Sequence, residues 1–189
     1  EVDFPRQDHA PIAPWLAQKT GMIAIGGPVW SREGVGYGNA LLSRYPVDRV
    51  RRWDLSVGRH EPRGALDVEL TICGRTVHVL NTHLGLWPRE RPQQADRLLE
   101  LLSLSRRDLT ILMGDLNEWH GWGKSLRGLR RVFGSPAAPV TFPARWPVLA
   151  LDRIWIFPAQ ALLTVEAHDT PRSRLASDHL PVKADIYLP

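Results

Sequence analysis

The sequence predicts an α+β sandwich in which two β-sheets pack face to face and helices lie outside them. Short apolar runs alternate with Gly, Pro and Asn along the whole chain, a pattern typical of many short strands. Few segments have the spacing of apolar side chains that favours a helix. This periodicity predicts the fold class but does not fix the order of the strands.

Strands are expected at residues 39–43, 50–55, 65–72, 76–82, 109–114, 152–157 and 182–187, with a further strand at 162–167. The clearest helix is expected at residues 91–104, because Leu98, Leu101 and Leu102 share one face. Two more helices are expected at residues 10–20 and 123–129. The prolines at the start of the first of these are tolerated there.

The bulk properties are those of one ordinary globular domain. The chain has 189 residues and a net charge of +4, most of it from arginine. Arginine binds phosphate oxygens through two parallel hydrogen bonds, so the excess suits a phosphate-bearing partner, although a solvated basic face explains it equally well. No apolar run is long enough to cross a bilayer.

The single cysteine, Cys73, excludes an internal disulfide. Its thiol is expected to be inert, in the core or at a strand end. A lone cysteine favours a reducing compartment, and the first residues do not form a signal peptide. A cytoplasmic location is therefore expected.

Polar side chains follow or precede four apolar runs at the expected strand ends. The four clusters are Asn81-Thr82-His83, Gly114-Asp115-Leu116-Asn117, Asp152-Arg153 and Ser177-Asp178-His179. Each alone has an ordinary explanation, such as a turn for Asp and Asn or a satisfied histidine at a strand end. Together they indicate one rim of a sheet where an active site lies.

Five segments in series resemble the motifs of the endonuclease/exonuclease/phosphatase superfamily. They are residues 37–44, 81–84, 114–117, 151–154 and 177–182. That superfamily includes deoxyribonuclease I-like nucleases, abasic-site endonucleases, inositol-polyphosphate phosphatases and sphingomyelinases. The resemblance implies a single domain over residues 1–189, with a four-layer α/β/β/α sandwich of two mainly antiparallel sheets.

The resemblance also gives a meaning to the first residue. Family members carry a strand that ends in Gln-Glu, so Glu1 is expected to bind a metal. The family's earlier strand, which ends in an active-site Asn, has no counterpart here. The domain is therefore expected to be N-terminally incomplete, or to take those strands from another chain. Exposed sheet edges would then invite a homodimer.

The reaction implied by the resemblance is hydrolysis of a phosphate ester by in-line attack of water. His179 would be the general base, and Asp152 would orient its imidazole and favour the imidazolium form. Glu1 and Asp178 would hold Mg²⁺ or Mn²⁺, which prefer oxygen ligands. Asp115 would position the water or protonate the leaving oxygen.

Donors for the phosphoryl oxygens are implied at Asn117 and at His83, the latter as a cation. Arg63 is expected either to bind substrate or to be an exposed loop arginine. Asn39 is expected to have a structural role at a strand start.

Trp87, Trp119 and Trp122 follow directly after the His83 and Asn117 motifs. One hypothesis is that they wall the pocket, with Trp119 binding substrate through its indole face. The alternative is that they pack beneath the loops as a small additional core.

Three functions remain open at the level of sequence. The first is a nuclease or phosphodiesterase on nucleic acid, motivated by Arg49, Arg51, Arg52, Arg127, Arg130 and Arg131. The second is a phosphatase or phosphodiesterase on small phosphates or phospholipid headgroups, although no long amphipathic insertion is visible. The third is a truncated, inactive fragment of such an enzyme.

Overall fold

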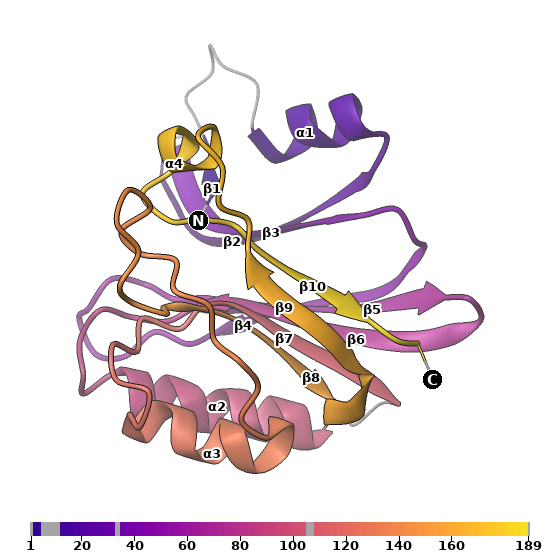
Figure 1. Ribbon diagram of the computed structural model, residues 1–189. Helices are drawn as coiled ribbons and strands as arrows, with labels where there is room; N and C mark the ends of the chain where they lie inside the picture. The colour runs from indigo at the N-terminus through magenta and orange to yellow at the C-terminus, as the bar shows by residue number, and fades with distance from the viewer. Residues whose placement is uncertain (1, 5–11, 33–34, 105–107, 189) are drawn as a thin grey trace.

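The computed structural model describes residues 2–4, 12–32, 35–104 and 108–188. A five-stranded sheet forms its centre, with helices α2 (Arg91–Leu104) and α3 (Lys124–Phe133) on one face. Two smaller sheets cover the other face, and α1 (Ile12–Thr20) lies beyond them (Figure 1). The predicted α+β sandwich of face-to-face sheets and outer helices is confirmed.

The central sheet has the order β4-β5-β6-β7-β8. Its strands are β4 (Val47–Asp54), β5 (Gly64–Ile72), β6 (Arg75–His83), β7 (Leu109–Asp115) and β8 (Asp152–Phe157). Neighbours run antiparallel except β6 and β7, which are parallel. A parallel pair needs a long crossover, and α2 with its flanking loops supplies it.

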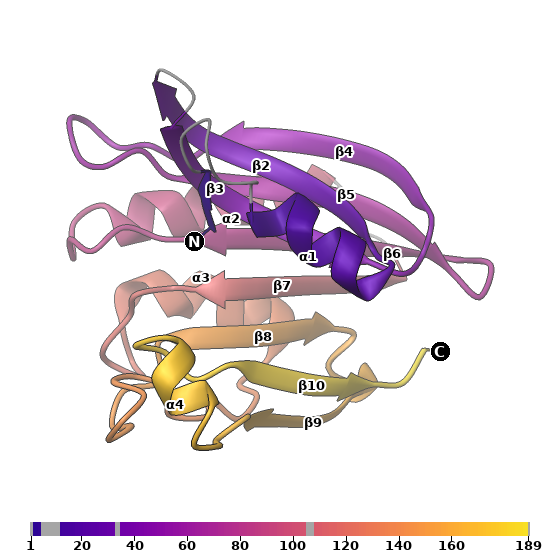
Figure 2. The same ribbon diagram turned by 90° about the horizontal axis from the view of Figure 1, so that it is seen from above.

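The opposite layer is divided into two sheets that lie side by side over the central one (Figure 2). One contains β1 (Val2–Phe4), β2 (Ile23–Arg32) and β3 (Val35–Ser43) in the order β1-β3-β2. The other pairs β9 (Leu162–Ala167) with β10 (Val182–Ile186). Part of this layer was not predicted, because the sequence Gly26-Gly27-Pro28 within β2 is typical of a turn.

The close pairing of β2 with β3 requires a glycine in β3 as well. A Cβ on Gly38 of β3 would collide with the backbone of Gly27 and Pro28 in β2. The two strands approach so closely here that only glycine fits.

Two apolar clusters hold the layers together. Leu98 and Leu102 of α2, and Leu129 and Phe133 of α3, pack beneath the sheet against residues such as Leu112. The predicted apolar face of α2 is therefore confirmed. A second cluster of Leu, Val and Ile side chains lies between the central sheet and the two smaller sheets. These clusters fix the sheet whose edge carries the polar motifs.

Several local features differ from expectation. Helix α3 runs four residues further than predicted and ends at Phe133, before Gly134, whose φ of 77° suits glycine. Cys73 is exposed and directly follows the end of β5, so of its two expected places the strand end is confirmed and the core is wrong. The four-residue helix α4 (Ser173–Ala176) was not predicted. In the described part of the chain, no helix is both long and apolar enough to cross a membrane.

Candidate active site at the edge of the central sheet

Three site residues form a row across neighbouring strands. His83, the last residue of β6, lies opposite Asp115, the last residue of β7. Asp115 in turn lies opposite Asp152, the first residue of β8. Parallel β6 and β7 end at this edge, while antiparallel β8 begins there, so three sequence motifs meet because of the sheet register.

Gly114 allows β7 to come close enough to β6 at this point. Its φ is 139°, and a Cβ there would collide with the Thr82 carbonyl. The Thr82 hydroxyl donates to the Gly64 carbonyl at 3.0 Å, which ties the end of β6 to β5. Asn39 donates to the same carbonyl at 2.9 Å and is buried, which agrees with the structural role expected for it.

His179 and Asp152 form a hydrogen-bonded pair, with His179 Nδ1 2.8 Å from Asp152 Oδ2. The Thr141 hydroxyl donates to the same oxygen at 2.5 Å, and the Phe142 ring lies 4.8 Å from the imidazole. The Leu180 amide donates to the Thr141 carbonyl at 2.9 Å, which holds the His179 loop in place. The contacts from Thr141 and Phe142 were missed, because residues 135–150 have no strand or motif pattern that marks them.

The electrostatics of this pair favour a charged carboxylate beside a basic imidazole. The hydrogen bond that His179 donates to Asp152 raises the pKa of His179 above its usual value. Burial opposes ionisation of Asp152, but hydrogen bonds from His179 and Thr141 outweigh it and lower its pKa. An imidazole with this partner accepts a proton readily and keeps one ring orientation.

Asp115 faces both histidines. Its Oδ2 lies 4.0 Å from His179 Nε2 and 3.5 Å from His83 Nε2. Burial raises the pKa of Asp115, and the nearby Asp152 charge adds to this effect. A carboxyl group of raised pKa can donate a proton more easily than an ordinary aspartate.

Asn117 organises the end of β7. Its backbone has a φ of 50°, in the left-handed region that Asn tolerates, and its amide N–H bonds Asp115 Oδ1 at 2.8 Å. Its side-chain amide donates to the Leu84 carbonyl at 2.8 Å and to His83 Nε2 at 2.9 Å. Both side-chain N–H groups are thus engaged with protein acceptors.

His83 is neutral, so its predicted cationic form is wrong. Burial lowers the pKa of His83 to about 3, and the Arg63 charge adds to this effect. Its Nε2 accepts the hydrogen bond from Asn117, which places the ring proton on Nδ1. A neutral imidazole in this position is still a hydrogen-bond donor, but it brings no positive charge.

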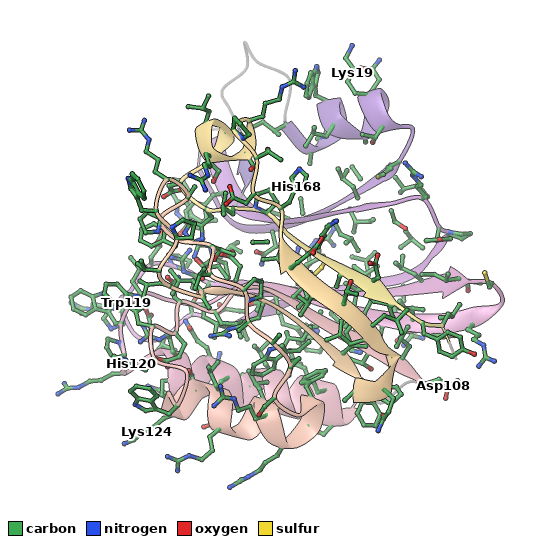
Figure 3. The ribbon with its side chains drawn as sticks, in the orientation of Figure 1. Lys19, Asp108, Trp119, His120, Lys124 and His168 are labelled. Carbon is green, nitrogen blue, oxygen red and sulfur yellow. The ribbon has the colours of Figure 1, made fainter. Side chains whose placement is uncertain are left out.

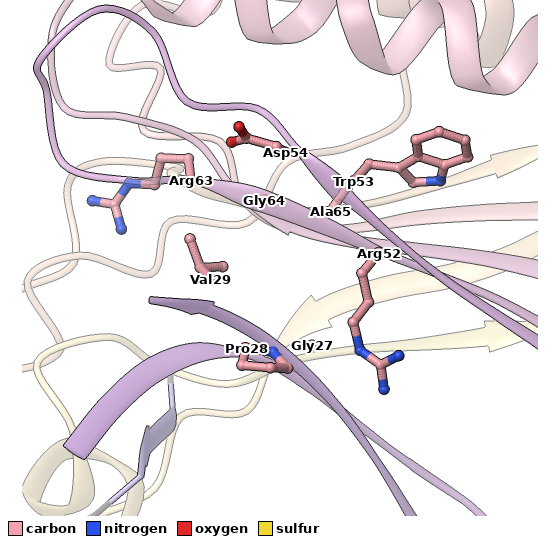
Figure 4. A pocket seen from close by; sticks show the side chains of 9 residues that line it. All are labelled: Gly27, Pro28, Val29, Arg52, Trp53, Asp54, Arg63, Gly64 and Ala65. Carbon is pink, nitrogen blue, oxygen red and sulfur yellow. The ribbon is translucent and has the colours of Figure 1, made fainter. Parts of the chain in front are cut away.

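Arg63 is buried, so the exposed-loop interpretation of this residue is wrong. Its Nη2 lies 2.7 Å from the Glu61 carboxylate. The side chain borders a cavity of about 220 Å³ between β2 and the start of β5, together with Pro28, Val29 and Asp54 (Figure 4). Arg63 thus supplies a buried positive charge close to His83.

The possible metal ligands are distributed unevenly. Ligand atoms of Asp115, Asp152 and His179 lie within 4.8 Å of one another, which makes this cluster a candidate divalent-metal site. Asp178 is exposed and lies outside that cluster, and its carboxylate accepts a hydrogen bond from Ser177 at 3.3 Å. Glu1 lies outside the described residues. Mg²⁺ needs only one or two carboxylates because it keeps several waters, so the carboxylates at this edge suit such an ion.

The tryptophans beside the site are exposed. The exposed fractions of Trp87, Trp119 and Trp122 are 61%, 60% and 80%. The alternative that they pack beneath the loops is therefore wrong. Trp119 borders a cavity of about 580 Å³ with Leu86 and Lys124, at the end of the molecule where the motifs gather (Figure 3).

Residues 1–179 match the model of the Endonuclease/Exonuclease/phosphatase family. The chain belongs to this family. Membership in the Endonuclease/Exonuclease/phosphatase family supports a hydrolase of the phosphoesterase type and a divalent metal at the site.

The chain is also similar in sequence to curated bacterial proteins. The protein YbhP of Escherichia coli K12 is 36% identical over 163 residues, covering 80% of this chain and 63% of its own length. The same values hold for YbhP of Shigella flexneri. The chain thus spans less than two thirds of the length of these curated relatives.

Several solved structures share the fold of this chain. The family protein from Bacteroides vulgatus superposes with a TM-score of 0.76 at 19% identity, covering 92% of this chain and 78% of its own. Mannosyl-6-phosphatase Bt3783 of Bacteroides thetaiotaomicron gives 0.69 at 17% identity, over 88% and 76% of the two chains. A humanized TDP2 of D. rerio gives 0.64 at 15%, over 90% and 79%.

Proposed function

We propose that the protein is a metal-dependent phosphodiesterase in which His179 and Asp152 activate the attacking water. The observation that carries the proposal is the 2.8 Å contact between His179 Nδ1 and Asp152 Oδ2, with Asp115 4.0 Å from the other ring nitrogen. Base, orienting carboxylate and acid thus lie at one edge of one sheet.

The steps follow from these positions. His179 takes a proton from water through Nε2 as the water oxygen bonds to phosphorus. The ester P–O bond opposite breaks, and Asp115 donates a proton to the leaving oxygen. The raised pKa of Asp115 supports this acid role over water positioning. The buried charge of Arg63 stabilises the phosphoryl oxygens, while Asn117 holds the neighbouring His83 ring in place.

A hard divalent cation, Mg²⁺ or Mn²⁺, would be held by carboxylates at this edge: Asp178 and Glu1, as the family resemblance implies, with Asp115 nearby. Such an ion supplies positive charge to the phosphoryl oxygens as they gain negative charge. Isothermal titration calorimetry should detect Mg²⁺ or Mn²⁺ binding, and Asp178→Asn should weaken it. Equal affinity in this variant would remove Asp178 from the ligand set.

The predicted arginine cluster gives nucleic acid little support as the substrate. Arg51 is engaged by Asp67 and Glu69, both at 3.1 Å, and Arg52 donates to the Gly26 carbonyl at 2.8 Å. Arg127 and Arg131 lie on α3, on the face of the sheet away from the two smaller sheets. A phosphodiester is therefore proposed as the reacting group without a nucleic-acid partner.

Hydrolysis of bis(p-nitrophenyl) phosphate with and without EDTA tests the function. The protein should release p-nitrophenol only with metal, and His179→Ala should lower kcat by about 10²- to 10⁴-fold. His168→Ala is the matched control, since this histidine is exposed and lies outside the cluster. Equal activity of the two variants would remove His179 as the base.

A preceding segment is proposed to complete the domain. The edges of β1 and β10 that face away from β3 and β9 have no strand partner among the described residues. The family resemblance implies an additional strand, ending in Asn, ahead of Glu1. A longer form of the protein should therefore have a higher Tm and higher activity per molecule. Identical Tm and activity would contradict this, and sedimentation would reveal dimerisation through the same edges.

A further inference from the structure

The four most exposed large apolar side chains among the described residues all lie at one end of the molecule. They are Trp122 and Leu175 at 80% exposure, Trp146 at 79% and Val148 at 70%. Each lies in a connecting segment that leads into or out of the edge carrying His179, Leu175 within the short helix α4 of its segment. Isolated exposed apolar residues are ordinary, but such a concentration around one site marks an interaction surface.

Two of these loops follow β6 and β7 directly. Leu86 and Trp87, both 61% exposed, come immediately after the His83 motif. Trp119 and Trp122 come immediately after Asn117. The 580 Å³ cavity opens between these loops, with Leu86, Trp119 and Lys124 in its lining. Apolar side chains therefore border the site on the α2 and α3 side.

The other two loops precede β8 and β10. Phe142 contacts the His179 ring, and the chain then carries Trp146 and Val148 outward before returning to Asp152. Leu175 lies in α4, which is joined to the same loop by a 3.3 Å hydrogen bond from Arg174 Nη1 to the Arg145 carbonyl. The apolar side chains thus stand on both sides of the catalytic row.

Basic side chains alternate with the apolar ones. Arg89 follows Trp87, Lys124 follows Trp122, Arg145 precedes Trp146 and Arg172 precedes Leu175, and all four basic residues are exposed. In these loops Glu90 and Glu118 are buried, and exposed Asp169 is paired with Arg174 at 2.6 Å, which leaves Asp178, the proposed metal ligand, as the other exposed carboxylate. The surface is consequently apolar and positively charged.

This composition selects among partners. Leu86, Val148 and Leu175 have no ring to stack on a nucleobase, so single-stranded nucleic acid would leave them unused. A second copy of the chain would bring like charges together across a symmetric interface. A bilayer with anionic lipids satisfies both features, because tryptophan prefers the headgroup region and Lys and Arg are attracted to the negative surface.

We propose that these four loops form a docking surface for an anionic phospholipid bilayer, which brings the His179 edge to the level of the lipid phosphates. This inference rests on the proposed phosphodiesterase function, because the position of the His179 edge beside the lipid phosphates matters only if that edge cleaves phosphodiesters. It names the substrate class as a phosphodiester in a lipid headgroup, reached at the membrane surface.

Vesicle sedimentation tests the docking surface. The probes are vesicles of phosphatidylcholine alone and of phosphatidylcholine mixed with phosphatidylglycerol in equal parts. The protein should bind the mixed vesicles, and combined Val148→Ser, Trp146→Ser and Leu175→Ser should weaken binding by about tenfold or more. Leu163→Ser is the matched control, since Leu163 is 63% exposed but lies at the start of β9, towards the opposite end of the sheet.

The outcomes separate docking from catalysis. The triple variant should keep its circular dichroism spectrum and its activity on bis(p-nitrophenyl) phosphate, and His179→Ala should still bind mixed vesicles. Unchanged vesicle binding by the triple variant would overturn the docking surface. So would absence of binding in a protein that hydrolyses the chromogenic diester, or displacement from vesicles by a single-stranded oligonucleotide. Failure to hydrolyse any diester, with vesicle binding intact, would overturn only the proposed function.

Discussion

Asn117 donates a 2.9 Å hydrogen bond to His83 Nε2, from a backbone position with a φ of 50°. The same amide group donates to the Leu84 carbonyl, so one side chain joins the end of β6 to the end of β7. Asn117 therefore contributes to the stability of the fold in two ways, through its hydrogen bonds and through its tolerance of a left-handed backbone conformation.

Substitutions at Asn117 should separate these two parts. Asn117→Gly keeps the left-handed conformation but leaves buried acceptors unpaired, so it should cost about 1–3 kcal/mol of unfolding free energy. Asn117→Ala should cost about 1 kcal/mol more, because alanine resists a positive φ. Urea unfolding curves of the two variants provide the measurement. Equal midpoints would show that the backbone conformation carries no cost.

The depressed pKa of His83 should make stability depend on pH. An unfolded chain protonates this histidine below about pH 6.5, whereas the folded protein does so only near pH 3. The unfolded state binds more protons in that window, so stability is lost as the pH falls. The slope from this group should approach about 1.4 kcal/mol per pH unit.

Unfolding free energies measured between pH 6.5 and pH 5 test this expectation. His83→Gln should flatten the dependence, since glutamine does not titrate. An unchanged slope in that variant would assign the effect to other groups. Direct titration of His83 by NMR should show a neutral ring throughout the same range.

Asp152 should control the pH at which the protein becomes active. The pKa of His179 is raised chiefly by Asp152, and His179 must be neutral to accept a proton. Activity should therefore rise with pH through a value above that of a free histidine. Asp152→Asn should move this rise to lower pH and reduce kcat by about 10²- to 10⁴-fold.

The profile of kcat/KM against pH is the readout for this change. Thr141→Val, which removes the other donor to Asp152, should keep the acidic limb near the position found in the unmodified protein. If the acidic limb of the profile did not move in Asp152→Asn, a group other than His179 would control the activity in that pH range.

Gly114 should tolerate no side chain. Its φ of 139° and its closeness to the Thr82 carbonyl mean that Gly114→Ala must force β6 and β7 apart. The strained conformation alone should cost about 1–3 kcal/mol. Gly121→Ala is the control, since a Cβ there meets nothing within 4 Å. Similar thermal unfolding temperatures for the two variants would contradict this explanation.

Local patterns predicted most of the central sheet and its motifs. The expected strands at residues 152–157 and 162–167 coincide with β8 and β9, and the expected helix at residues 91–104 coincides with α2. In each case side-chain spacing and chain-breaking residues agree with the final structure. The polar motifs were found because they interrupt those apolar runs abruptly.

Other features depend on tertiary contacts that no local pattern reveals. The Gly-Gly-Pro sequence in β2 is strand only because Gly38 lets a neighbouring backbone approach. The neutral state of His83 comes from burial and from Arg63, which is distant in the sequence. Thr141 supports Asp152 from a loop without a recognisable motif.

The alignment of His83, Asp115 and Asp152 across β6, β7 and β8 separates the parts of the chain that can vary from those that cannot. Because side chains alternate between faces, inserting one residue within β7 would shift the strand ahead of the insertion by one position and turn its inward side chains outward. Inserting residues in the surrounding loops leaves the row intact. The sheet can thus act as a fixed frame for chemistry, while loop length and composition remain free to evolve new substrate preferences.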